Sequence, residues 1–285
     1  MKKLLLMAVL GVFTFLNANV NAIVSILPQQ TFLKAIGGDK VNIALMVKPG
    51  NSPHTYEPKP SQMKDISAAD IYFSIDVEFE HVWLERFQNQ NRSMKIVDIS
   101  KGIQKEAMSS HSHGDKHNHD YHKKTKKDPH IWTSPNNVKK IVQNIYNELV
   151  KIDKKNKTYY KSNLDKFLKH IEKTDNEIKT ILKDIPKDTK FMVFHPAWGY
   201  FATQYNLIQL AIEIEGKSPK PKDLAYILEE AKEENVKAIF TQPEFSDKIA
   251  KTIAKQLNIK VIKTSPLSPK WNKNLIKFAT AIANK

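Results

Sequence analysis

Three of the ten histidines in this sequence stand directly beside a proline, in the pairs Pro53-His54, Pro129-His130 and His195-Pro196. Neutral imidazole is the commonest side-chain ligand for transition metals. Proline fixes its own φ and restricts the residue before it, so the backbone near each imidazole is stiffened and loses less entropy when a ligand binds. Spacing alone leaves two interpretations equally open, a shared metal site and three ordinary loop histidines.

The predicted places of these histidines favour a ligand site. His54 lies in a loop after a predicted strand at 41–47, and His195 ends the strand predicted at 190–195. His130 follows a long polar segment. Ligands of open α/β sheets bind beyond the carboxyl ends of the strands. Two of the three histidines are therefore expected where a ligand would be held.

A second group of histidines lies in the polar segment 101–128, together with Asp115 and Asp120. Histidine-rich tracts bind metals through neutral imidazole, and the competing interpretation is a solvated low-complexity insert. We favour additional, weaker metal sites, since long loops in compact domains are usually functional or disordered. His81 and His170 lie inside predicted helices and are assigned to no site. The loop histidines are His111, His113, His117, His119 and His122.

Short apolar runs alternate with amphipathic helical stretches in both halves of the chain. This alternation predicts an α/β fold in which helices connect parallel strands. The two halves share one plan. Strands are expected at 23–27, 41–47, 70–75, 95–99, 190–195, 207–214, 237–241 and 260–264, and helices at 30–36, 78–90, 136–150, 157–182, 221–235, 246–257 and 270–283.

One predicted helix, at 157–182, is much longer than the others. Its apolar residues, from Tyr160 to Leu182, recur mostly every three or four positions, and Pro186 ends it. A helix of this length between two α/β halves is expected to be a rigid strut. The predicted division is a signal peptide at 1–22, an N-terminal lobe at 23–155 with the loop 101–128, a connecting helix at 156–186 and a C-terminal lobe at 187–285.

The N-terminus has the three parts of a secretory signal peptide. Met1-Lys2-Lys3 is positively charged, residues 4–16 are apolar, and the stretch that ends at Ala22 offers a small-residue cleavage site. Cleavage after Ala22 would start the mature chain at Ile23. The alternative is a membrane anchor, but the apolar run is short for a span.

The chain contains no cysteine, so it has no disulfide, no thiolate ligand and no cysteine for attachment of a lipid. No later segment is long and apolar enough to cross a membrane. We therefore expect a periplasmic protein that is neither membrane-embedded nor lipid-anchored.

The net charge of +15 could suggest a nucleic-acid partner. Only Arg86 and Arg92 are arginine, however, and the remaining positive charge is lysine spread over predicted helix faces. Recognition of bases and phosphates favours arginine. Nucleic-acid binding is not expected.

Four segments resemble the motifs of the metal-binding proteins of zinc and manganese ABC importers, and within that family they are most similar to the periplasmic, zinc-binding ZnuA type. The resemblance covers essentially all of the predicted mature chain, in order. The segments are PGNSPHTYEPKPSQ (49–62), DPHIWTSPNN (128–137), FHPAWGYFATQY (194–205) and KPKDLAYILEEAKEENVKAIFTQPEFS (220–246).

The resemblance implies two α/β lobes joined by one long helix, with the metal in the cleft between them. By motif, His54 and His130 would be ligands from the first lobe and His195 a ligand from the second. It also implies a monomer that is not an enzyme, captures Zn²⁺ with high affinity and delivers it to the permease of an inner-membrane ABC importer. The ligand chemistry agrees, because imidazole suits zinc whereas manganese prefers oxygen.

One position departs from the family. Many members supply a fourth, carboxylate ligand from an Asp-Pro-Leu motif, and here the matching residues are Ser265-Pro266-Leu267. Neutral serine is a poor zinc ligand. Water, a nearby glutamate or a histidine of the loop 101–128 could fill the fourth position.

Two other functions compete with transport. Three histidines and a water also make a catalytic zinc site, so a secreted zinc hydrolase is the main alternative. The HExxH arrangement of one large class of zinc proteases is absent. A passive histidine-rich metal buffer would need only the loop.

Overall fold

The computed structural model describes residues 19–108, 127–213, 217 and 219–283. Within them the chain forms two four-stranded parallel sheets, ordered β2-β1-β3-β4 and β6-β5-β7-β8. The repeated order confirms that the two halves share one plan. We call the half around the first sheet the first lobe and the half around the second sheet the second lobe. The strands are β1 (Val20–Val24), β2 (Val41–Leu45), β3 (Ile71–Ser74), β4 (Lys95–Asp98), β5 (Thr189–Val193), β6 (Leu207–Ala211), β7 (Ala238–Thr241) and β8 (Lys260–Lys263).

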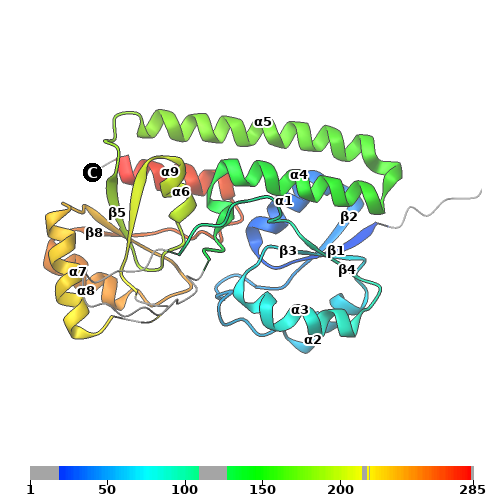
Figure 1. Cartoon of the computed structure of the whole chain (residues 1–285), viewed down its shortest axis with the longest axis horizontal. Coiled ribbons are helices and arrows are strands. Elements are labelled where there is room, and N and C mark those ends of the chain that lie inside the picture. The colour runs from blue at the N-terminus through cyan, green and yellow to red at the C-terminus, as the bar shows by residue number, and fades with distance from the viewer. Residues whose placement is uncertain (1–18, 109–126, 214–216, 218, 284–285) are drawn as a thin grey trace, which may run out of the picture.

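The helices cover the sheets and connect parallel strands, as the predicted α/β fold requires (Figure 1). The helices that precede the long helix are α1 (Leu27–Gly37), α2 (Pro60–Ser67), α3 (Glu78–Gln90) and α4 (Pro135–Ile152). The long helix is α5 (Lys157–Leu182), and the helices after it are α6 (Gly199–Gln204), α7 (Pro221–Glu233), α8 (Lys248–Leu257) and α9 (Trp271–Ala283). Short 3₁₀ turns are η1 (Gly38–Lys40), η2 (Ile131–Thr133) and η3 (Lys154–Asn156).

The helix α5 has the bounds that the apolar periodicity predicted. Its buried side chains include Tyr160, Leu164, Ile171 and Ile178, all on one face. Figure 1 shows α5 running along both lobes, with α4 and α9 beneath it. The predicted fold of two lobes and one long helix between them is confirmed.

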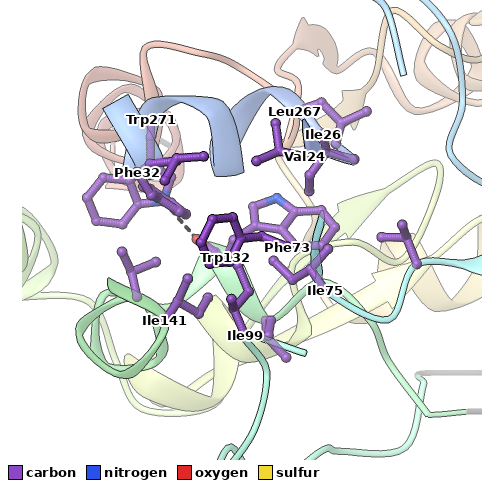
Figure 2. Close-up of a cluster of buried hydrophobic side chains, with 14 of the residues drawn as sticks. Val24, Ile26, Phe32, Phe73, Ile75, Ile99, Trp132, Ile141, Leu267 and Trp271 are labelled. Carbon is purple, nitrogen blue, oxygen red and sulfur yellow. Dashed lines mark hydrogen bonds between the residues drawn. The ribbon is translucent and has the colours of Figure 1, made fainter. Parts of the chain in front are cut away.

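The two lobes share a buried core, part of which Figure 2 shows around Trp132 and Trp271. The indole N–H of Trp271 on α9 donates to the backbone carbonyl of Trp132 at 2.7 Å, and the indole N–H of Trp132 donates to the carbonyl of Pro266 at 2.8 Å. Phe32 of α1 packs edge-on against the Trp271 ring. The helix α9, which the predicted division assigns to the second lobe, therefore also contacts the first. Truncating Trp271 to alanine is expected to cost about 3–5 kcal/mol of stability.

Some element ends differ from the predicted ones for local reasons. The strand β1 begins at Val20 rather than Ile23, because Val20 to Ala22 pair with Val41 to Ile43 of β2. The helix α1 begins three residues early because Gln29 accepts hydrogen bonds from the backbone N–H groups of Ser25 and Ile26 and so organises the first turn. Residues 1–18, most of the predicted signal peptide, lie outside the described residues, and the cleavage point stays a prediction.

None of the described helices combines the length and the apolar character that crossing a bilayer requires.

Candidate metal centre

His54 lies in the loop between β2 and α2, and this loop is fixed by Gln62 at the start of α2. The Gln62 amide donates to the carbonyl oxygens of Leu45 and Met46 at the end of β2 and accepts from the Tyr56 hydroxyl at 2.6 Å. One glutamine side chain thus ties the strand, the loop and the helix together. The His54 imidazole is held at the edge of the first sheet, partly buried.

His130 immediately precedes the 3₁₀ turn η2 and is buried. The Asp128 carboxylate accepts from the His130 backbone N–H at 2.9 Å, and the Asp128 backbone N–H donates to the carbonyl of Glu106. The Tyr200 hydroxyl of the second lobe donates to the Asp128 carbonyl at 2.8 Å. Asp128 is therefore an anchored residue of the site, although the predicted loop 101–128 included it.

His195 lies two residues beyond β5 rather than in the strand. The backbone N–H of Phe194 still donates to Phe240 of β7, after which the chain turns at His195-Pro196. The ring of His195 is buried and stacks on Phe245, with ring centroids 4.8 Å apart. This contact fixes the plane of the imidazole.

The three imidazoles meet at one point between the lobes. The Nε2 atom of His195 lies 2.9 Å from Nε2 of His54 and 3.4 Å from Nε2 of His130. Zinc–nitrogen bonds of about 2.0–2.1 Å in a tetrahedron separate the nitrogens by about 3.3 Å. The spacing thus suits three corners of a tetrahedral site. Among the described residues, His54, His130 and His195 are the one set of three or more histidines and carboxylates close enough to hold a metal ion.

Each of these imidazoles has a carboxylate on its other nitrogen. A carboxylate that accepts from Nδ1–H fixes the tautomer, leaves the lone pair of Nε2 for the metal and raises the basicity of the ligand. Sequence analysis assigned none of these carboxylates to the site. Hydrogen bonds join His130 Nδ1 to Asp128 at 2.7 Å and His195 Nδ1 to Glu213 at 2.7 Å, and a carboxylate oxygen of Glu78 lies 2.9 Å from His54 Nδ1.

The sequence did contain a signal for two of these partners. Glu78 is the first residue of α3, four positions after β3 ends, and Glu213 follows the end of β6 by two positions. Carboxylates just beyond parallel strands collect at the edge of the sheet where the histidines were expected. Which carboxylate pairs with which imidazole depends on the tertiary arrangement.

Burial sets the protonation state of His195. It lowers the pKa of His195 to about 4, although the adjacent Glu213 carboxylate opposes the shift. The ring is therefore neutral at neutral pH, which is the form that binds a metal.

Ser265 does not point its hydroxyl into the group of three histidines. The Ser265 Oγ donates to Glu244 Oε1 at 2.9 Å and accepts from the backbone N–H of Leu267 at 3.1 Å. The hydroxyl is thus used in the turn after β8, and nothing in its contacts makes it a metal ligand.

Two of the remaining histidines lie away from the three-histidine group, and the other five lie outside the described residues. His81 is exposed and pairs with Asp76 at 2.6 Å, while His170 is exposed on α5 beside Phe167. Neither joins the three-histidine group. The five loop histidines, His111, His113, His117, His119 and His122, lie outside the described residues.

Comparison with known proteins identifies the family of the chain. The family model of the zinc-uptake complex component A, periplasmic (ZnuA), matches residues 23–284. The chain belongs to the ZnuA family. The match contains all three converging histidines and all three carboxylate partners.

Individual known proteins resemble the chain over most of its length. It is 32% identical to the high-affinity zinc uptake system protein ZnuA of Bacillus subtilis, over 82% of this chain and 74% of that protein. It is 28% identical to the zinc-binding protein AdcA of Streptococcus pyogenes, over 93% of this chain but 56% of AdcA, so it spans little more than half of that relative. A crystal structure of ZnuA superposes with a TM-score of 0.85 and 39% identity, covering 93% of this chain and 98% of that one.

Proposed function

We propose that this protein captures zinc in the periplasm with high affinity and delivers it to the permease of an ABC importer in the inner membrane. The observation that carries the proposal is the convergence of three Nε2 atoms, each on an imidazole whose Nδ1 faces a carboxylate. Three neutral nitrogen ligands in near-tetrahedral array suit Zn²⁺ better than Mn²⁺ or Mg²⁺, which prefer oxygen.

The placement of the ligands suits reversible capture. His54 and His130 come from the first lobe and His195 from the second, so a bound ion would bridge the lobes. Membership of the ZnuA family, and the zinc uptake and zinc binding named for the relatives from B. subtilis and S. pyogenes, support transport over the zinc hydrolase. Zinc is the cargo in this proposal and undergoes no reaction.

A metal titration tests the proposal directly. The mature protein is titrated with Zn²⁺, Mn²⁺ and Cu²⁺ in competition with a chromogenic chelator. We expect one tight zinc site per chain and much weaker manganese binding. Zinc-limited growth of cells that lack the protein is then compared with and without the gene restored. Tight manganese binding with weak zinc binding would contradict the proposal, and so would turnover of an ester, peptide or carbonate at the bound metal.

The location and the assembly state belong to the same proposal. The signal-peptide pattern of the N-terminus and the absence of cysteine support a periplasmic protein without a lipid anchor. The protein would act as a monomer that docks on the permease. N-terminal sequencing of the periplasmic fraction checks cleavage, and sedimentation of the purified protein with and without zinc checks the monomer.

A further inference from the structure

The three-histidine group leaves one corner of a zinc tetrahedron without a ligand from these residues. Glu78, Asp128 and Glu213 lie on the Nδ1 side of the rings, away from the point where the Nε2 atoms meet. We propose that Glu244 supplies the fourth ligand, through one carboxylate oxygen that turns toward the ion when zinc binds. This inference rests on the proposed capture of zinc and names a further residue of the same site.

The position of Glu244 in the chain brings it beside the ligands. It lies in the segment after β7, at the same sheet edge as His195. On one side of it in sequence, the Gln242 amide donates to the His195 carbonyl at 3.4 Å. On the other side, the Phe245 ring stacks on His195 and lies 6.4 Å from the His54 ring. Residues on both sides of Glu244 in this segment, Gln242 and Phe245, therefore contact His195.

Glu244 also faces the first lobe. It lines a cavity of about 360 Å³ together with Pro49 and Gly50, which belong to the loop that carries His54. A second, smaller cavity beside it is lined by Asn51 of the same loop and again by Glu244. The carboxylate thus lies on the cleft between the lobes rather than on the outer surface of the second lobe.

The carboxylate has little to offset its charge. Within the described part of the chain, the lysines that form ion pairs near this cavity, Lys251 and Lys263, pair with Asp247 and not with Glu244. The Glu244 carboxylate accepts from the Ser265 hydroxyl at 2.9 Å and from its own backbone N–H. Lys263 borders the same cavity, but it pairs with Asp247. Burial raises the pKa of Glu244 because the charged form is poorly solvated. A divalent cation nearby would stabilise that charge.

Zinc binding would require a change of Glu244 rotamer. In the present structure its carboxylate is directed to Ser265, and the tight metal-binding group contains the three histidines alone. Turning away from Ser265 breaks one hydrogen bond, and the Ser265 hydroxyl keeps its bond to the backbone N–H of Leu267. The ligand set would then be three neutral imidazoles and one carboxylate, which reduces the net charge of the site from +2 to +1.

The test compares Glu244→Gln with wild type and with Glu229→Gln, a control that removes an exposed carboxylate from the same lobe. Zinc affinity is measured by chelator competition, and the Co²⁺-loaded proteins are compared by visible absorption, which reports the ligands directly. We expect Glu244→Gln to bind zinc about tenfold or more weaker and to shift the Co²⁺ bands, while Glu229→Gln matches wild type. The zinc-free melting temperature of Glu244→Gln checks that the fold is intact.

A rescue variant sharpens the test. The Ser265 Oγ lies 2.9 Å from the Glu244 carboxylate, so Glu244→Gln combined with Ser265→Asp places a carboxylate at nearly the same point. This double variant should recover part of the lost affinity and the wild-type Co²⁺ bands. Unchanged zinc affinity and unchanged Co²⁺ bands in Glu244→Gln would overturn the inference and leave water or a loop histidine as the fourth ligand. In that case tight zinc binding by wild type would leave the proposed function standing, whereas no tight site in wild type would defeat both.

Discussion

His54 Nε2 lies 2.9 Å from His195 Nε2, although the two residues belong to different lobes and are 141 positions apart. The Nδ1 atom of each ring faces its own carboxylate, Glu78 or Glu213, which favours the tautomer with the proton on Nδ1. Two lone pairs would then face each other across the cleft. Such an arrangement is favourable only when a cation or a proton lies between the nitrogens, so the lobes are held in a geometry that suits a bound ion.

Removing one imidazole should therefore weaken the tight zinc site. We expect His54→Ala, His130→Ala and His195→Ala each to lower zinc affinity about tenfold or more, because even residues that only orient metal ligands contribute 10–100-fold. His170→Ala, on the outer face of α5, is the control and should match wild type. Chelator competition measures the affinities. Wild-type affinity in His195→Ala would show that these residues do not form the tight site.

The carboxylate partners should matter although they do not touch the ion. Glu213→Gln keeps the shape of the side chain but removes the charge that holds the proton on Nδ1 of His195. We expect zinc affinity to fall by about 10–100-fold. Glu177→Gln, an exposed carboxylate on α5, should have no effect. Equal affinities for the two variants would mean that Glu213 serves the fold alone.

The pKa of His195 predicts how the stability of the zinc-free protein depends on pH. It is about 4 in the folded state, against about 6.5 in an unfolded chain. Between these values the unfolded state binds the proton and the folded state does not, so the free energy of unfolding falls as pH drops from about 6.5 to about 4. The loss is at most about 3 kcal/mol.

Urea unfolding of zinc-free wild type and His195→Gln at several pH values between 4 and 7 measures this effect. Carboxylates titrate in the same pH range in both proteins. The difference between the two plots of unfolding free energy against pH therefore isolates the contribution of His195. The free energy of unfolding of wild type should fall more steeply toward acid than that of the variant. Parallel curves would mean that His195 is not held neutral by burial.

Zinc should stabilise the fold because the unfolded chain has no preformed site. A ligand at a hundredfold excess over its dissociation constant adds about 2.7 kcal/mol when only the native state binds it. The melting temperature should rise with zinc and return when a chelator is added. His130→Ala, measured at the same zinc concentration, should show a smaller rise. An equal rise in both proteins would place the stabilising ion elsewhere.

Sequence patterns predicted the elements better than their assembly. The periodicity of α5 gave both of its ends, because a long amphipathic helix carries many repeats of one signal. The strand order β2-β1-β3-β4 depends on how crossover helices pack, which the alternation of elements does not encode. The start of β1 at Val20 was missed because pairing with β2, not local composition, extends the strand.

In the candidate site, too, the local features were predicted from the sequence and the tertiary contacts were not. Motifs and strand ends were enough to select His54, His130 and His195, and the structure brings their Nε2 atoms together. That they hold a metal stays a prediction. The carboxylate partners were missed because Glu213 reaches His195 across two neighbouring strands, β6 and β5, and such a pair has no fixed spacing along the chain.

The last prediction concerns the histidine-rich loop. Ala107 and Lys127 form an antiparallel bridge, and Asp128, the partner of His130, follows at once. A deletion should therefore remove 109–126 and join the ends through a short Asn-Gly turn, which suits two antiparallel strands. Deleting all of 101–128 would also remove Asp128 and weaken the tight site for an unrelated reason.

We expect this shorter deletion to lower the number of zinc ions bound but to leave one tight site. The five histidines between 109 and 126 lie in a polar sequence with few apolar residues, so each ion they bind must bear the cost of ordering the chain. Calorimetry of the intact and deleted proteins measures both stoichiometry and affinity, and a variant with the five histidines changed to asparagine controls for loop length. If the deletion or the asparagine variant abolishes the tightest site, a loop histidine is a ligand of the captured ion, and neither Glu244 nor water fills the fourth position.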